Sequence, residues 1–385
     1  MRSIDYDKSA IILFTTAPPT SLEDDPNYLD VVIQAVERQL EINIVIVPPF
    51  GMRDQCTSSG SFDVLADLVR QTGGNILNLC NSYNPATYNN NDLIIQFLNG
   101  YGNTHHHIEN IAYGFSGTCS STVQFTIEDT KNLFSESYIF VNSPSVETFK
   151  VTVTNLDDGS ALSTKSMTNL PYMAIYKIET SSTAPYAKGL SANVQAGSGS
   201  GNCSVRVGLR SQLGVYVGFS PDPSRDKLIS TMIYGTTINP VVHVSSALQS
   251  SAQVMAIATD DAGTEIYNYT AVTRSPTCHY EKYFMTPMTC SKPYTSETVT
   301  VKIVTNELTV QRSVRGFCSF DQQRCHNGGT YSANTNSCNC TDGYSGAVIF
   351  FRVLEFHFNY NHHLGLRESS LFKRRNRGVL PLLLH

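Results

Sequence analysis

Charged residues are scarce in this chain. Asp, Glu, Lys and Arg make up 15% of its 385 residues, below the roughly one quarter that is usual in globular domains. The formal net charge is −5, and the composition shows neither the basic excess of a nucleic-acid-binding protein nor an acidic tail. Nucleic acid is therefore not expected as a partner. Ser, Thr, Asn and Tyr are abundant instead, which suits secreted β-rich domains better than cytosolic enzymes.

The sequence also lacks a long apolar segment. The best run, at residues 347–351, ends at Arg352 and is too short to span a membrane. The amino terminus has neither the apolar core nor the small-residue cleavage site of a signal peptide. Because the cysteine usage described below indicates an oxidising compartment, we expect an extracellular protein whose chain lacks its true start.

Motifs for nucleotide binding and nucleophilic catalysis are missing as well. No glycine pattern of the Walker or Rossmann type is present. Serine lies among glycines at 114–117 and 197–201, but neither stretch matches the strand, nucleophile and helix order of a hydrolase elbow. Cysteines in an oxidising compartment are expected to be paired rather than nucleophilic. The sequence therefore predicts no enzyme, no catalytic residue and no cofactor.

Candidate metal ligands have simpler explanations. The three histidines at 105–107 are adjacent, and neighbouring side chains of an extended chain point to alternate faces, so a solvated linker is favoured over one chelated ion. Asp24 and Asp25 can cap a helix that begins at Pro26. The Asp-Asp-Gly sequence at 157–159 indicates a hairpin turn rather than a calcium site. We expect no metal site.

The hydrophobic pattern changes near residue 104. Before it, short apolar runs at 11–14, 44–47 and 76–79 alternate with helical patterns at 25–40 and 61–73, which predicts a parallel α/β sheet. After it, runs alternate at period two between turn signals, which is typical of antiparallel β-sandwiches. We expect five parts: a partial α/β domain at 1–103, β-sandwiches at 104–209 and 210–317, a small disulfide-stapled module at 318–346, and a disordered tail at 347–385.

Ten cysteines are present, and four of them lie between Cys318 and Cys340. The Cys338-Asn339-Cys340 spacing is too tight for a zinc site, so disulfides are favoured over metal. Elsewhere the candidate pairs are Cys56 with Cys80, Cys119 with Cys203, and Cys278 with Cys290, although spacing alone does not fix connectivity. Three N-x-S/T sequons, at Asn202, Asn268 and Asn339, are candidate glycosylation sites.

Residues 8–100 resemble the second half of a von Willebrand factor type A domain, a Rossmann-type α/β fold. The IILFTTAP run at 11–18 resembles that fold's central strand, and the double glycine at 73–74 matches its late helix-and-strand segment. Thr16 stands where metal-binding members have an aspartate, and the D-x-S-x-S loop is absent. A hard cation needs convergent oxygen ligands, so the resemblance implies no metal-ion-dependent adhesion site.

Residues 318–346 resemble an EGF-like module. The C-H-N-G-G-T-Y segment from Cys325 and the C-N-C-T-D-G-Y-S-G segment from Cys338 carry the likeness, which implies that these two cysteines pair. Tyr331 replaces a cysteine found in many members, and the cysteine expected after Gly346 is missing. The likeness stops at that glycine, so we expect the carboxyl-terminal part of the chain also to be cut from something larger.

The order of these parts resembles secreted nematode proteins of the infection-response type and, more distantly, hemicentin-like matrix proteins. This resemblance implies an extracellular, non-enzymatic recognition or adhesion protein that acts in innate immunity. The expected partners are extracellular proteins or glycans. Two alternatives stay open: a structural component of the extracellular matrix, and a truncated product with little activity of its own.

Overall fold

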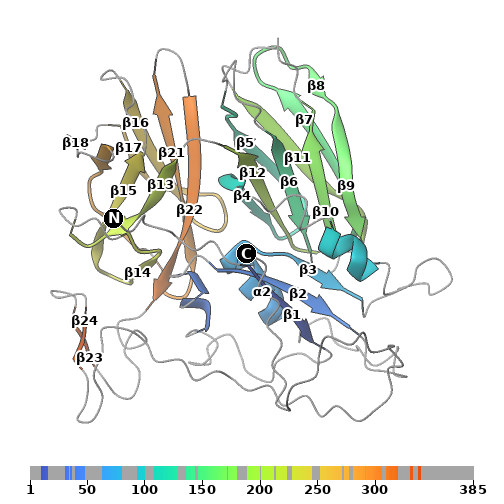
Figure 1. Ribbon diagram of the computed structural model, residues 1–385, viewed down its shortest axis with the longest axis horizontal. Coiled ribbons are helices and arrows are strands. Elements are labelled where there is room, and N and C mark those ends of the chain that lie inside the picture. The colour runs from blue at the N-terminus through green and yellow to red at the C-terminus, as the bar shows by residue number, and fades with distance from the viewer. Residues whose placement is uncertain are drawn as a thin grey trace, which may run out of the picture.

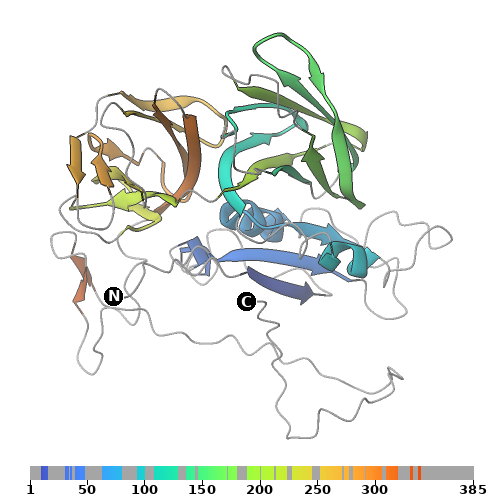
Figure 2. The same cartoon turned by 45° about the horizontal axis from the view of Figure 1, so that its top comes forward.

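The computed structural model consists of three packed units (Figures 1 and 2). Two β-sandwiches stand side by side, and a layer of parallel strands and helix lies against them. The structure describes residues 10–15, 31–33, 35–36, 40–47, 63–79, 93–99, 108–128, 136–143, 146–170, 172–179, 189–199, 201–211, 214–222, 228–244, 252–270, 273–276, 281–290, 292–305, 309–319, 330–332 and 337–339.

The parallel layer contains three strands in the order β1-β2-β3. They are β1 (Ala10–Thr15), β2 (Glu41–Ile46) and β3 (Ile76–Asn78), and β2 pairs in parallel with both neighbours. Helix α2 (Asp63–Thr72) carries Leu65, Leu68 and Val69 toward one face of β2, where Ile42 and Ile44 lie. The helix ends at Gly73, whose φ of +74° is the left-handed conformation that glycine adopts without strain.

The expectation of a von Willebrand factor type A, Rossmann-type α/β domain is wrong. In the described residues strands predominate and form several antiparallel sheets, with few helices. A doubly wound sheet carries helices on both faces. Here, one face of the parallel layer packs against the first sandwich, where Val45 and Leu77 meet Tyr138 and Phe140. Helical residues 93–99 contribute Leu93 and Phe97, both fully buried, to the same cluster. The chain is therefore a mainly β protein.

The first sandwich is formed by strands between residues 108 and 210. One sheet has the order β4-β12-β6-β10-β9 and the other β5-β11-β7-β8. Their bounds are β4 (Ile108–Ser116), β5 (Ser120–Phe125), β6 (Ser137–Asn142), β7 (Val146–Asn155), β8 (Ala161–Leu162), β9 (Thr164–Leu170), β10 (Met173–Ile178), β11 (Leu190–Gly199) and β12 (Cys203–Arg210). Alternate apolar residues of both sheets, among them Val123, Val194 and Val205, form one buried core.

The second sandwich is formed by strands between residues 215 and 319. One sheet has the order β13-β15-β19-β18, with β20 also paired to β15, and the other β14-β22-β21-β16-β17. Their bounds are β13 (Val215–Ser220), β14 (Thr231–Ile233), β15 (Thr237–Val244), β16 (Gln253–Thr259), β17 (Glu265–Tyr269), β18 (Thr273–Pro276), β19 (Glu281–Phe284), β20 (Met288–Thr289), β21 (Ser296–Val304) and β22 (Thr309–Ser319). The short β14 pairs with β22 in parallel, while the other neighbours are antiparallel.

A two-stranded hairpin follows, formed by β23 (Thr330–Ser332) and β24 (Ser337–Asn339). It lies inside the span that resembles an EGF-like module, and the identity of that module stays a prediction. No helix in the described part of the chain is both long and apolar enough to cross a membrane.

Candidate functional site

Buried charged side chains gather where the three units meet, and we call this region the junction. Asp261, in the turn between β16 and β17, lies between two guanidinium groups. Its Oδ2 is 2.7 Å from Nη1 of Arg70 on α2, and its Oδ1 is 2.6 Å from Nη2 of Arg315 on β22. Arg70 also contacts Asp67, one turn earlier on the same helix. One carboxylate of the second sandwich is thereby tied to the parallel layer.

The first sandwich contributes aromatic rings to the same place. The Cζ atom of Arg70 lies 5.1 Å from the ring centroid of Phe115, and that of Arg315 lies 5.7 Å from the ring centroid of Tyr113. A guanidinium over an aromatic face is favourable, and more so when both are removed from water. Both rings belong to β4, so all three units contact this cluster of charges.

These contacts set the protonation of the junction. Burial alone would raise the pKa of Asp261, but Arg315 and Arg70 outweigh it and hold that pKa below its ordinary value. Burial would likewise lower the pKa of Arg70, yet Asp67 and Asp261 raise it. Burial raises the pKa of Tyr113. A general acid needs a carboxyl group whose pKa is raised, so Asp261 is suited to an ion pair rather than to proton transfer.

The contact between the parallel layer and the first sandwich has its own ion pair. Arg206 on β12 approaches Glu41 on β2 with both terminal nitrogens at 3.4 Å, and its guanidinium lies 4.1 Å from the ring centroid of Phe140. Beside it, Asn142 Nδ2 donates to Asn75 Oδ1 at 3.0 Å. These groups are buried, and leaving them unbonded would be costly, so they fix the position of the layer on the sandwich.

The two sandwiches are joined by the most deeply buried ion pair of the junction. Arg312 Nη1 on β22 lies 2.5 Å from Glu128 Oε1, and the two side chains are 3% and 1% exposed. Ser211 accepts a hydrogen bond from Arg312 at 2.9 Å and donates one to Glu128 at 2.7 Å. Next to them, Gln311 Nε2 donates to the carbonyl of Ile111 at 2.6 Å.

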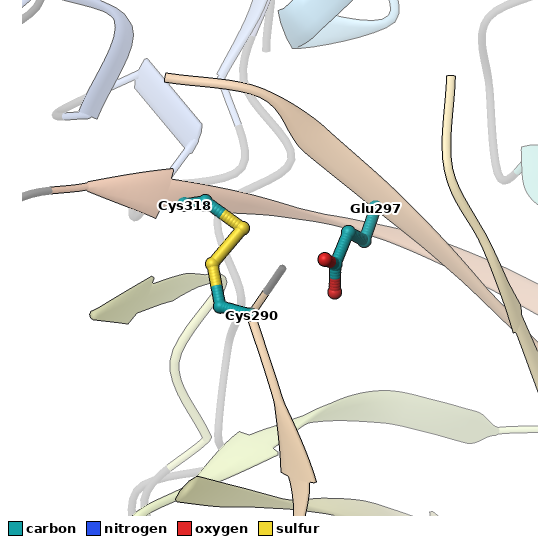
Figure 3. Close-up of side chains that lie close together, drawn as sticks. All are labelled: Cys290, Glu297 and Cys318. Carbon is teal, nitrogen blue, oxygen red and sulfur yellow. A yellow bond between two sulfur atoms is a disulfide. The ribbon is translucent and has the colours of Figure 1, made fainter. Parts of the chain in front are cut away.

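One cluster in the described residues consists of side chains that could bind a metal ion, and the bonding of its sulfur atoms decides whether it can. Cys290, Glu297 and Cys318 place their ligand atoms within 4.8 Å of one another, and all three are buried. The two sulfurs are joined in a disulfide, with the carboxylate of Glu297 turned toward it (Figure 3). Metal ions in such sites are bound by thiolates, which a disulfide does not offer. The cluster is therefore a disulfide beside a carboxylate.

Two disulfides are present in the described residues. Cys119 is bonded to Cys203, as one of the candidate pairs predicted, and the bond links the turn between β4 and β5 to the first residue of β12. The pairing of Cys278 with Cys290 is wrong, because Cys290 is bonded to Cys318 at the end of β22, with 5.9 Å between their Cα atoms. The candidate cysteines Cys56, Cys80 and Cys325 lie outside the described residues, as does Cys278, and the side chain of Cys338 is not among those described.

The remaining predicted residues fall into three groups. Asn202 and Asn268 are exposed, as a glycan acceptor must be, whereas the side chain of Asn339 is not described. The Asp-Asp-Gly sequence at 157–159 forms the turn between the antiparallel β7 and β8, which confirms the hairpin. The histidines at 105–107, together with Asp24 and Asp25, lie outside the described residues. Sequence reasoning missed the charged residues of the junction, since no motif marks them.

Comparisons with known proteins give no family. No family model matches the chain, and no curated protein does. Among solved structures, a DUF4785 family protein from Legionella pneumophila is 10% identical over 56% of this chain and 66% of its own, with a TM-score of 0.27. A putative beta-galactosidase from Bacteroides fragilis is 10% identical over 51% of this chain and 32% of its own, with a TM-score of 0.19. Likeness of this degree carries no argument about fold or function.

Proposed function

We propose that this chain is an extracellular, non-enzymatic recognition or adhesion protein. The observation that carries the proposal is the junction, in which an ion pair lies at each contact among the three units, buried at the two contacts of the first sandwich and half-buried between α2 and the second sandwich. Such pairs are weak evidence for stability, but they specify one arrangement, since any other leaves charges buried and unpaired. A fixed arrangement of two sandwiches presents their end loops as one surface, which is what a binding protein needs.

The extracellular part of the proposal has separate support. Disulfides persist in oxidising compartments and are rare in the cytosol, and both sandwiches contain one. Two sequons lie on exposed asparagines, Asn202 and Asn268, so glycosylation there is part of the proposal. The non-enzymatic part rests on the junction carboxylates, each of which is engaged by a guanidinium. A role in infection response comes from the sequence resemblance alone and stays a prediction.

The test is secretion followed by binding. The full chain, fused to a heterologous signal peptide, is expressed in insect cells, and peptide mapping without reduction reads its disulfides and glycans. The purified protein is then titrated against immobilised collagen, laminin and fibronectin and against a glycan array. We expect both disulfides and saturable binding to one class of ligand. Retention of free thiols at all four cysteines, or no binding to any of these surfaces, would contradict the proposal.

A further inference from the structure

The disulfide between Cys290 and Cys318 lies inside the second sandwich, beside a carboxylate. Cys290 directly follows β20, which pairs with β15 in one sheet, whereas Cys318 lies in β22 of the other sheet. The N–H of Cys318 donates to the carbonyl of Thr295 at 2.8 Å, which places Cys318 diagonally across from Glu297 on β21. Side chains in that relation stand on the same face of a sheet. Three chain segments thus bring two sulfurs and one carboxylate together (Figure 3).

The three groups are close enough to hold one ion, and they are shielded from water. Their ligand atoms all lie within 4.8 Å of one another. Cys290 and Glu297 are each 1% exposed, and Cys318 is 0% exposed. Sulfur and oxygen ligands of one tetrahedral zinc ion lie roughly 3.6–3.8 Å apart. The carboxylate is already near that range, and the sulfurs reach it by turning their side chains once their bond is broken, because their Cα atoms are 5.9 Å apart.

We infer that this cluster is a redox-controlled zinc site, in which the reduced sulfurs of Cys290 and Cys318 and the carboxylate of Glu297 bind one Zn²⁺. A dithiol reductant passes two electrons and two protons to the disulfide, so the protein gains two thiols and the reductant becomes a disulfide. Zn²⁺ then displaces the two thiol protons into solvent and binds the sulfurs as thiolates. The inference goes beyond the proposed function, because it concerns the core of the second sandwich and none of its surfaces.

The donor set selects zinc and makes the ion necessary to the reduced form. Thiolates are soft ligands that suit zinc, whereas Mg²⁺ and Ca²⁺ prefer oxygen. Two buried thiolates beside the carboxylate of Glu297 repel one another strongly, and a divalent cation offsets that repulsion. A carboxylate has two oxygens, so one binds the ion while the other keeps a hydrogen bond of its own. The two sheets are then linked in either state, covalently when oxidised and through zinc when reduced.

The first sandwich contains a matched control for this site. Its disulfide joins Cys119 and Cys203, which are equally buried, at 1% exposure each. Among the described residues, no His, Asp or Glu forms a group of possible metal ligands with these two cysteines. Zinc should therefore favour reduction of the Cys290–Cys318 bond and leave the Cys119–Cys203 bond unaffected.

The experiment measures the reduction of each disulfide separately. The full chain is equilibrated at a series of ratios of reduced to oxidised dithiothreitol, with free Zn²⁺ either held at a fixed micromolar level by a chelator or removed. Alkylation of free thiols and peptide mass spectrometry then give the reduced fraction of each bond. At a given dithiol ratio, zinc should raise the ratio of reduced to oxidised Cys290–Cys318 at least about tenfold, a shift of about 30 mV, and leave Cys119–Cys203 unchanged. Mg²⁺ should affect neither bond.

Glu297→Gln tests the third ligand. This variant keeps both cysteines and a side chain of the same length, so it should form the disulfide, but its neutral amide is a poor zinc ligand, and zinc should change its reduction less than about threefold. The wild-type comparison uses two bonds of one chain and does not depend on the folding of any variant. No effect of zinc on Cys290–Cys318, an equal effect on both bonds, or a full effect in Glu297→Gln would overturn the inference.

Discussion

Replacing Asp261 by asparagine removes a negative charge from between two guanidinium groups that are largely shielded from solvent, with 18% of Arg70 and 9% of Arg315 exposed. The carboxylate accepts charge-assisted contacts from Arg70 and Arg315, at 2.7 and 2.6 Å. Asparagine has one side-chain oxygen, so it can keep one of these contacts in neutral form and must lose the other. Arg70 keeps its contact with Asp67, whereas Arg315, whose side chain is 9% exposed, is left near the like charge of Arg70.

The size of the effect follows from this geometry. Breaking a buried ion pair by removing one partner costs about 3–5 kcal/mol. Asp261 is 24% exposed in its side chain, and one hydrogen bond survives, so the loss lies at or below the lower end of that range. We expect Asp261→Asn to lower the free energy of unfolding by about 2–3 kcal/mol. Urea unfolding followed by far-ultraviolet circular dichroism measures this difference.

The matched control is Asp158→Asn, in the exposed turn between β7 and β8. Asp158 Oδ1 accepts a hydrogen bond from the N–H of Ser160 at 2.9 Å, which an asparagine side chain can replace. Surface substitutions of this kind change stability little. If Asp261→Asn cost no more than this control, the view that the ion pairs hold the units in place would be refuted.

Further predictions concern pH, the second disulfide and the helix end. The pKa of Asp261 in the folded protein lies below its unfolded value of roughly 3.9, so the stability that this carboxylate contributes is present above that pH and is lost as the pH falls through the folded pKa. The difference in free energy of unfolding between wild type and Asp261→Asn, measured in urea, should therefore shrink in acid. A difference that does not change with pH would contradict this. Replacing both Cys290 and Cys318 by alanine opens a loop of 28 residues and should lower the free energy of unfolding by about 3.5 kcal/mol on the chain-entropy model, whereas Cys278→Ala should not cause this loss. A larger loss in Cys278→Ala than in the Cys290 and Cys318 double variant would instead support a bond between Cys278 and Cys290. A Cβ at Gly74 would lie 1.9 Å from the carbonyl oxygen of Ile42, so Gly74→Ala should destabilise the protein by at least about 1–3 kcal/mol in thermal unfolding. A Cβ at Gly235 would have no atom within 4 Å, so Gly235→Ala should cost only the strain of its positive φ.

The sequence predicted local structure where the pattern is set by the nearest neighbours. Val151 and Val153 alternate with Thr152 and Thr154, and this period of two predicted the strand that the structure contains as β7. The same reasoning predicted the turn after β7 from its Asp-Asp-Gly sequence. In both cases the evidence lay within a few residues of the element itself.

The prediction of the fold class failed because an apolar face of a sheet does not identify the elements that cover it. Val45 and Leu77 are apolar on the face turned away from α2, which fits a doubly wound sheet covered by helices on both sides. The same two side chains fit an antiparallel sheet equally well, and that is what covers them. Only contacts between residues far apart in the sequence distinguish the two cases.

The junction could not have been predicted for a related reason. Asp261 lies in a turn of Asp, Ala and Gly residues, and Arg70 lies in the last turn of a helix, where a basic side chain is favoured by the helix dipole. Each residue has a sufficient local explanation, so nothing in the sequence indicated that they pair. The bond between Cys290 and Cys318 was missed in the same way, since spacing does not fix connectivity.

We hold that the ion pairs of the junction keep the three units as one body, a claim that differential scanning calorimetry tests most directly. For the wild type at neutral pH, we expect one transition with equal calorimetric and van't Hoff enthalpies. For the chain carrying Asp261→Asn and Glu128→Gln together, we expect the transition to separate into at least two. Separate transitions in the wild type, or one undivided transition in the double variant, would contradict the claim.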